Sequence, residues 1–360
     1  MIYIFVLLLT IFFQLSDKGK YESRLFFLFG LFLIVFCSFR YGGFSTGDYF
    51  TYVKYGQLVT NFNQVIEQSI PVEIGFRFVS YIINYFQFPK NTSVVFMGII
   101  STIPVIYIIN KYSCYKFLSV LVWLPYFFTM NMHSARTSVA AGMGLLFLIF
   151  IFEKKYIKAF LSFIVAVSFH QLSLGYFFIT LSLFSINILI TILIFIMFFV
   201  AIFDPIQIIV HGLDFIGFSG LGYRIMAYSS SDTFSQSFSM IDPRSLLFIS
   251  ILCLYINISR RINERFYLYI SKLFLIGGII MYLFSSLVII SWRLSYLFFI
   301  VNILFIPKIC EVYNLLPNDS IRIPRLMNVI LSIVYTLWVL YLIYGSQNYS
   351  FILFPSKDIS

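Results

Sequence analysis

The chain has 360 residues, of which 61% are hydrophobic and only 11% are charged, whereas an ordinary soluble domain carries roughly 25% charged residues. A soluble protein with 46 Phe and 26 Tyr could not cover its surface with polar groups, so the composition predicts an integral membrane protein with many spans. The formal net charge is +10, but the basic residues are dispersed between apolar segments, which argues against nucleic acid as a partner.

Apolar stretches of membrane length recur along the whole chain. They cover residues 2–15, 25–39, 74–88, 93–109, 117–131, 136–152, 157–180, 185–203, 245–258, 268–290, 294–309 and 327–344. These stretches predict an all-α, polytopic membrane protein with about 10–12 transmembrane helices. We expect residues 1–360 to form a single transmembrane domain.

Lysine and arginine in the loops predict which side of the membrane each loop faces, because cytoplasmic loops carry an excess of both. By this rule four basic loops are cytoplasmic, namely 16–24, 153–158, 260–265 and 308–326. The polar segments 40–73 and 204–244 then face outward as two sizeable periplasmic loops. The second segment has the Gly- and Ser-rich composition of a mobile substrate-binding loop.

Strict alternation of twelve spans conflicts with this rule at two places. It would put residues 110–116 and 153–158 outside despite their lysines. We therefore expect one re-entrant or broken element within 74–109 and another within 157–203. Irregular backbone at membrane depth is tolerated only where protein or a watery cavity covers it, so both regions point toward a site.

Arginine dominates the basic residues of the predicted outward half, where Lys54 is almost the only lysine. The arginines are Arg40, Arg77, Arg136, Arg224, Arg244 and Arg293. A guanidinium grips phosphate or carboxylate with a planar fork, so this bias suits a site for an anionic lipid head group. For any single arginine, the alternative is an interfacial anchor that snorkels to lipid phosphates.

A dense polar motif, residues 40–52, follows the second apolar stretch. Its glycines suit a tight turn, and Ser45 or Thr46 could cap a helix that starts near Asp48. That helix would set the Asp48 carboxylate beside the rings of Tyr52 and Tyr55, an arrangement suited to holding a sugar. An interfacial amphipathic helix with an aromatic belt is the alternative.

Other ionisable residues stand where an apolar segment begins or runs. Glu73 and Arg77 are four residues apart and could form a structural ion pair on one helical face. Arg136 lies between two apolar segments and needs an anionic partner, as does Arg293 in its short outward turn. His170 interrupts the stretch 157–180, where a histidine is either a hydrogen-bonded core residue or a functional one.

The order of these motifs resembles the EpsG family, which belongs with the Wzy-type polymerases of bacterial surface polysaccharides such as O-antigen, capsule and exopolysaccharide. The residues that carry the resemblance are Arg40, Gly47-Asp48-Tyr49 with Tyr52, Glu73-x-Gly75-Phe76, Arg136 before an Ala/Gly-rich helix, Phe169-His170, and Arg293 with Tyr296. After the matching arginine the family usually has Gln or a similar residue, whereas this chain has Thr137, so no role is assigned there.

The resemblance implies a polymerase in the bacterial inner membrane with its active site facing the periplasm and, as one candidate fold, a GT-C-like arrangement of its helices. It would transfer a growing glycan from undecaprenyl pyrophosphate to the terminal sugar of a second lipid-linked repeat unit. Pyrophosphate is the leaving group, so the enzyme has to stabilise negative charge and activate one sugar hydroxyl. The expected partners are the undecaprenyl-pyrophosphate-linked oligosaccharide, membrane lipid and a chain-length regulator protein.

Residue roles follow from this reaction. Arginines can stabilise the charge without a metal, so Arg136 and Arg293 are the expected pyrophosphate clamps, with Arg40 or Arg224 as a third. The candidate general bases are Asp48, Glu73 and His170, and the candidate sugar-binding rings are Tyr49 and Tyr52. No metal ligand is assigned and no cofactor is expected, because the chain lacks a P-loop, a GxSxG elbow, an HExxH helix and a convincing DxD site.

Two other functions stay open at this point. A flippase or other transporter of lipid-linked oligosaccharide would also use many spans, broken helices and membrane-embedded arginines, although the segment pattern shows no two-fold repeat. A membrane O-acyltransferase acting on polysaccharide would need a histidine near the acyl donor, usually at the cytoplasmic face, and His133 is the candidate.

Overall fold

The computed structural model describes residues 2–15, 22–43, 46–67, 70–133, 135–215, 242–314, 323–345 and 351–353, with a few positions between 217 and 226. The regular elements in these ranges are helices apart from one two-stranded antiparallel ribbon, in which Arg40 pairs with Leu353. The all-α fold expected from the composition is therefore confirmed.

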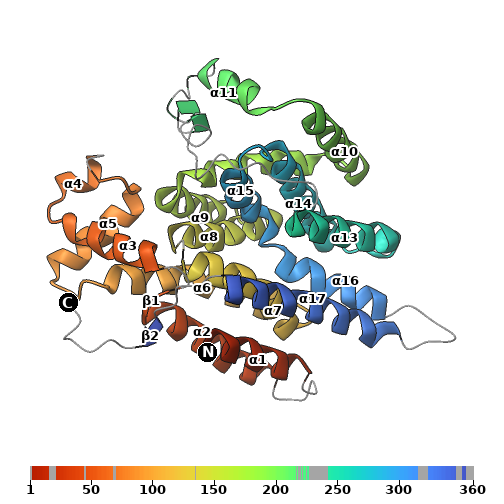
Figure 1. Ribbon diagram of the computed structural model, residues 1–360, viewed down its shortest axis with the longest axis horizontal. Coiled ribbons are helices and arrows are strands. Elements are labelled where there is room, and N and C mark those ends of the chain that lie inside the picture. Colours follow the sequence, from red (N-terminus) through yellow and green to blue (C-terminus); the bar gives the residue numbers. More distant parts are fainter. Residues whose placement is uncertain are drawn as a thin grey trace. The chain divides into compact units, whose positions relative to one another are not determined.

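Two compact units make up the chain, one from Met1–Leu174 with Asn302–Ser360 and the other from Gly175–Val301. The helices and strands of the first unit are α1 Ile2–Leu15, α2 Glu22–Ser38, β1 Arg40–Gly42, α3 Thr46–Leu58, α4 Asn63–Ile66, α5 Ile74–Tyr85, α6 Thr92–Tyr112, α7 Lys116–Tyr126, η1 Phe127–Asn131, α8 Ala135–Phe152, α9 Tyr156–Phe169, α16 Asn302–Asn314, α17 Ile323–Gly345 and β2 Phe351–Leu353 (Figure 1). The elements of the second unit are α10 Ile186–Ile202, α11 Ile206–Phe215, α13 Pro243–Ile258, η3 Ser259–Arg261, α14 Arg265–Leu283 and α15 Val288–Phe299. The 3-10 helix η2 Gln171–Leu183 runs across the boundary.

Four of the described helices are long and apolar enough to cross a membrane: Thr92–Tyr112, Ala135–Phe152, Arg265–Leu283 and Met327–Tyr344. Two bent helix pairs raise this number to six if each pair is counted as one span, and one of them joins α10 to α11 at 109°. The chain is thus a multi-pass membrane protein. The full count of 10–12 spans stays a prediction, because several of the twelve apolar stretches form helices shorter than 18 residues.

The core of the first unit is built around α7. Every residue from Phe117 to Tyr126 is buried, and the helix contacts α1, α16 and α17. A helix that is apolar on all sides lies either inside the protein or against lipid, and here other helices cover every side. The predicted stretch 117–131 is therefore an interior helix, and its last five residues widen into the π-helix η1.

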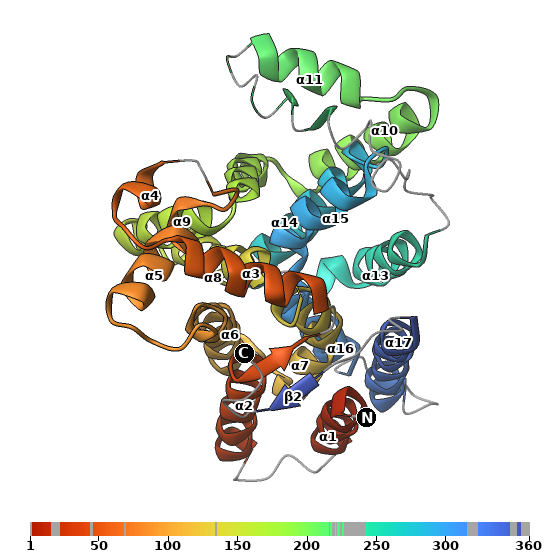
Figure 2. The ribbon, with the colours of Figure 1, turned by 60° about the vertical axis from the view of Figure 1, so that its left-hand side comes forward.

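Both regions expected to contain an irregular element are interrupted. The predicted stretch 157–180 is not one span, because α9 ends at Phe169 and His170 is extended before the 3-10 helix η2 begins. In the other region, α5 has 12 residues, about 18 Å of helix, whereas a span of the hydrocarbon core needs about 30 Å. With α3 and α4, α5 forms a helical group visible in both views (Figures 1 and 2).

Close backbone contacts hold the long helices of the first unit together. A Cβ on Gly142 of α8 would lie 2.7 Å from the carbonyl oxygen of Ser101 on α6, and one on Gly98 would lie 2.8 Å from Cα of Ser38 on α2. Small residues let membrane helices approach until their backbones touch. The Ala/Gly run after Arg136 thus packs α8 against α6, which fixes where the N-terminus of α8 lies.

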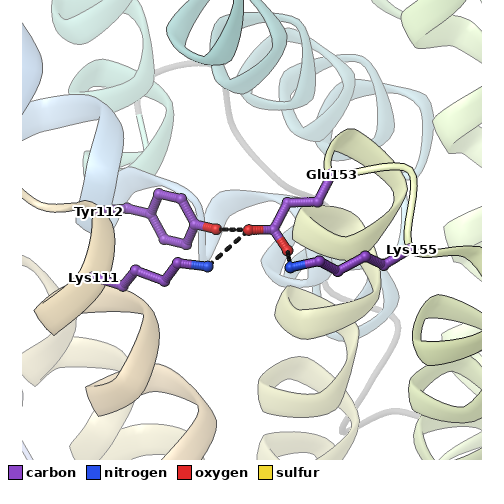
Figure 3. A network of polar contacts seen from close by, with 4 residues as sticks. All are labelled: Lys111, Tyr112, Glu153 and Lys155. Carbon is purple, nitrogen blue, oxygen red and sulfur yellow. Dashed lines mark hydrogen bonds and ion pairs between the residues drawn. The ribbon is translucent and has the colours of Figure 1, made fainter.

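Charged side chains join these helices at the end of α8 farthest from Arg136. Glu153, just after α8, accepts hydrogen bonds from Lys111 and Lys155 at 2.8 Å each, and from the Tyr112 hydroxyl (Figure 3). Partial burial by itself would raise the pKa of the Glu153 carboxyl, but the hydrogen bonds from Lys111, Lys155 and Tyr112 lower this pKa to about 2. The network links the end of α6 to the turn between α8 and α9.

We expect Glu153→Gln to lower the melting temperature of the detergent-solubilised protein at pH 7 by about 2–4 °C, corresponding to about 1 kcal/mol. The folded-state pKa lies below the ordinary value of about 4.3, so this stabilisation is present above pH 4.3 and is lost as the pH falls toward 2. Thermal unfolding at pH 7, 4 and 3 measures it. An equal difference between the two proteins at every pH would contradict the network.

Candidate functional site

An ion pair between Arg136 and Glu73 lies at the centre of the candidate site. Arg136 is the second residue of α8 and Glu73 directly precedes α5, and the Nη1 of Arg136 donates to Oε2 of Glu73. The side chains are 22% and 15% exposed. The guanidinium carbon also lies 5.5 Å from the centre of the Tyr52 ring on α3, within range of a cation–π interaction. Three elements far apart in the sequence thus converge on one cation.

The guanidinium retains binding capacity beyond this pair. Arginine has five N–H donors in a planar fork, and the buried Nε of Arg136 has no hydrogen-bond partner among the described residues. Because the group is partly desolvated, an electrostatic contact to an incoming anion would be stronger there than at an exposed surface. The arrangement suits an anionic ligand held beside Glu73 and Tyr52.

A carboxylate and an imidazole form a second pair, and the imidazole belongs to a residue near Arg136 in the sequence. Asp48 is in the first turn of α3, and its Oδ2 lies 3.7 Å from Nε2 of His133, in the turn between η1 and α8. The side chains of His133 and Asp48 are 31% and 39% exposed. A ligand can therefore reach the carboxylate of Asp48. Its partner His133 precedes Arg136 by only three residues in the sequence.

Gly43 allows Asp48 and His133 to lie this close together. A Cβ at position 43 would lie 2.2 Å from the carbonyl oxygen of Met132, so only glycine allows the first polar segment to lie against the turn before α8. Behind it, the buried Arg40 donates to the carbonyls of Cys37 at 2.5 Å and of Gly42 at 3.2 Å. The Asp48 and His133 backbones are brought together by this close packing.

Gly75 does the same for Glu73. A Cβ at position 75 would lie 2.6 Å from Oγ and 2.8 Å from the carbonyl oxygen of Ser168, near the end of α9. His170 follows at the break after α9, where its Nδ1 accepts a hydrogen bond from the Leu172 N–H at 3.2 Å. The candidate base His170 thus lies at the end of α9 that packs against the start of α5.

The structure corrects one expected contact. Glu73 does not pair with Arg77; it lies outside the helix and pairs with Arg136, 63 residues away. Arg77 is 5% exposed and its Nη1 donates to the carbonyl of Glu67. Spacing of four residues predicts a pair only when both residues are helical, and Glu73 has the extended backbone of an N-cap.

The tyrosines expected to bind sugar are largely covered by protein. Tyr49 is 3% exposed and packs against Tyr41, with ring centres 5.5 Å apart, while Tyr52 is 5% exposed and packs against Phe76 as well as Arg136. Burial raises the pKa of the Tyr49 hydroxyl, and the nearby Arg40 opposes the shift. Direct sugar contact by either ring stays a prediction.

The remaining candidates have different settings. Arg40 is 1% exposed and bound to backbone carbonyls of its own segment. Arg293 lies on α15 of the second unit and is half-buried, whereas Arg224 falls outside the described residues. Pyrophosphate binding by these three arginines stays a prediction.

Arg244, in the second unit, forms a bidentate pair that the sequence did not specify. It binds Asp242 through two 2.7 Å hydrogen bonds and lies 5.1 Å over the Trp292 ring. Partial burial would raise the pKa of the Asp242 carboxyl, but its hydrogen bonds with Arg244 lower that pKa overall.

Comparison with models of protein families identifies the family of the chain. The family model named EpsG matches residues 23–355, nearly the whole chain. The chain belongs to the EpsG family. No curated protein and no solved structure gives a significant match. The matched range contains all the residues of the candidate site, and EpsG membership supports a membrane protein of polysaccharide biosynthesis that works as a polymerase on lipid-linked substrates.

For this EpsG protein, Gly75→Ala should destabilise the packing of α5 on α9 and displace Glu73. The added methyl group would meet the carbonyl group of Ser168 as well as its hydroxyl, and backbone cannot move aside as a side chain can, so we expect a loss of about 1–3 kcal/mol together with reduced polymer formation in cells. Gly212→Ala is the control, because a Cβ there would meet nothing within 4 Å. Equal melting temperatures and equal polymer for the two variants would contradict the described packing.

Proposed function

We propose that the protein is a polysaccharide polymerase that transfers a glycan from undecaprenyl pyrophosphate to the terminal sugar of a second lipid-linked repeat unit. EpsG membership supports the polymerase in general. The observation that carries the specific reaction is Arg136, a partly buried guanidinium fixed by Glu73 and Tyr52 next to the accessible Asp48–His133 pair. The site thus combines an anion-binding group with a group able to accept a proton.

Arg136 would stabilise the leaving pyrophosphate. Negative charge develops on the phosphate oxygen as its bond to the anomeric carbon breaks, and a fixed cation at that place lowers the barrier. Glu73 holds the guanidinium in one orientation, so little reorganisation is needed during the reaction. Arg293, Arg40 and Arg224 are proposed as further pyrophosphate ligands on the weaker ground of their residue type.

Of the three candidate bases, Asp48 suits the acceptor hydroxyl best. Its side chain is 39% exposed, whereas Glu73 is 15% exposed and bound to Arg136. A general base must reach the hydroxyl from which it takes the proton. A histidine ordinarily titrates near neutral pH, but the Nδ1 of His170 already accepts the Leu172 N–H.

The proposed side of the membrane follows from α8. Arg136 and Glu153 are 17 residues apart along this helix, which corresponds to about 26 Å, close to the thickness of the hydrocarbon core. Lys111, Lys154 and Lys155 lie at the Glu153 end. The positive-inside rule then places the lysines in the cytoplasm and the Arg136 site at the periplasmic face of the inner membrane.

The same arrangement bears on the alternatives. His133 lies at the Arg136 end of α8, opposite the lysines, which does not favour an acyltransferase drawing its acyl donor from the cytoplasm. A flippase would use Arg136 as part of a transport path, and the test below separates it from a polymerase. The chain-length regulator remains an expected partner, and metal independence a proposed property of the reaction.

We expect Arg136→Ala to reduce polymerisation by at least about 100-fold, the usual effect of removing a group that stabilises transition-state charge. Arg136→Lys should restore little, because an ammonium lacks the planar fork. The assay incubates the purified protein with the undecaprenyl-pyrophosphate-linked repeat unit from its host, without nucleotide or added metal, and resolves the products on a gel.

Arg260→Ala is the matched control, because Arg260 is exposed in η3 and should make a wild-type ladder. A wild-type protein that forms no ladder but moves the lipid-linked unit across proteoliposomes would contradict the polymerase. A wild-type-like ladder from Arg136→Ala would contradict the site.

A further inference from the structure

We propose that His133 is a positioning residue for Asp48, which takes the proton from the acceptor hydroxyl. This inference rests on the proposed polymerase function and divides the site into two pairs. Glu73 orients Arg136 on the side of the leaving group, and His133 orients Asp48 on the side of the nucleophile. From the sequence alone, His133 is a candidate only for an acyltransferase.

The geometry of the imidazole supports a role in which only one ring nitrogen, Nε2, acts, and it acts on Asp48. Nε2 of His133 faces Oδ2 of Asp48 at 3.7 Å, whereas its Nδ1 is buried in the protein. A histidine that relays a proton needs both ring nitrogens, one for the substrate and one for the group that orients it. Here Nε2 is already turned toward Asp48, whose side chain is 39% exposed, so the carboxylate is the group that an acceptor sugar can approach.

The distance between the two atoms is also informative. At 3.7 Å the pair is longer than a hydrogen bond, but catalytic contacts in ligand-free sites are often long and tighten when substrate binds. The backbone on both sides is constrained, because Gly43 lies against Met132, the residue before His133. Small side-chain movements can therefore close the contact while the two segments stay together.

The charged groups around the pair are defined. On the His133 side, Arg136 follows three residues later and carries Glu73. On the Asp48 side, the first turn of α3 presents backbone N–H groups, which favour a negative charge, and Arg40 lies buried behind Gly43. The pair is thus flanked by Arg136 with Glu73 on one side and by the N-terminal turn of α3 on the other.

The proposed step balances without any further reactant. The acceptor O–H bond breaks as its proton passes to Asp48, and the oxygen forms a bond to the anomeric carbon of the donor glycan. The bond from that carbon to the pyrophosphate oxygen breaks, and its electron pair leaves with undecaprenyl pyrophosphate beside Arg136. Asp48 then returns the proton to water.

The test compares three variants in the ladder assay, with initial rates measured against the concentration of lipid-linked unit. Asp48→Asn should lose about 100-fold or more in kcat, as expected for a general base. His133→Leu should lose about 10-fold or more in kcat with KM within about twofold. His133→Gln keeps an N–H donor near the place of Nε2 and should recover most of that loss.

A spectroscopic measurement gives a second readout that does not depend on turnover. The chain has only three histidines, so ¹⁵N-imidazole NMR of the labelled protein in detergent can follow each ring. Asp48→Asn should shift the Nε2 resonance of His133 and leave those of His170 and His211 unchanged. Melting temperatures of all variants show whether a loss of activity reflects unfolding.

Several outcomes would overturn the inference, and each differs from a failure of the polymerase itself. A polymerising wild type with an active His133→Leu variant, or an unchanged His133 resonance in Asp48→Asn, removes the positioning role alone. A folded His133→Gln variant as inactive as His133→Leu means that His133 itself carries the proton. A wild type without polymerisation overturns the proposed function and this inference together.

Discussion

A guanidinium at the end of a membrane helix needs an anionic partner, and this requirement organises the first unit. Arg136 is the second residue of α8, and its partner Glu73 precedes it by 63 residues in the sequence. An unpaired charge at this partly buried place would cost several kcal/mol. The ion pair therefore requires α5, α8 and, through Tyr52, α3 to meet at one end of the unit.

Glycine provides the packing that this pair depends on. Gly43, Gly75 and Gly142 each lie where a Cβ would come within 2.8 Å of backbone or side-chain atoms of another segment. Gly43 allows the segment before Asp48 to lie against the turn that contains His133. Gly75 allows α5, which follows Glu73, to pack on α9, and Gly142 allows α8 to pack on α6. Close packing at these three points thus brings together polar residues that are distant in the sequence, as the pairs Arg136–Glu73 and His133–Asp48.

The helices, and the need of Arg136 for an anionic partner, could be predicted from composition and from the physical cost of a charge beside apolar segments. The partner of Arg136 could not, because spacing along a single helix favoured Arg77 for Glu73, whereas the actual contact depends on how α5 packs. For the break at His170, only the region 157–203 could be predicted. The charges of the loops indicate that an element in this region does not cross the membrane, but they do not indicate at which residue it is interrupted. His133 was overlooked as a partner of Asp48 because the two are joined through a Gly43 contact that no periodic pattern reveals.

Equilibrium binding of undecaprenyl pyrophosphate to the purified protein tests the central claim most directly, because it isolates the anion site from catalysis. Arg136→Ala should weaken binding at least about 10-fold, the equivalent of about 1.4 kcal/mol, while Lys155→Ala, at the opposite end of α8, should bind like the wild type. Unchanged affinity in a folded Arg136→Ala variant would contradict the account, because the Glu73–Arg136 pair would then be a structural ion pair only.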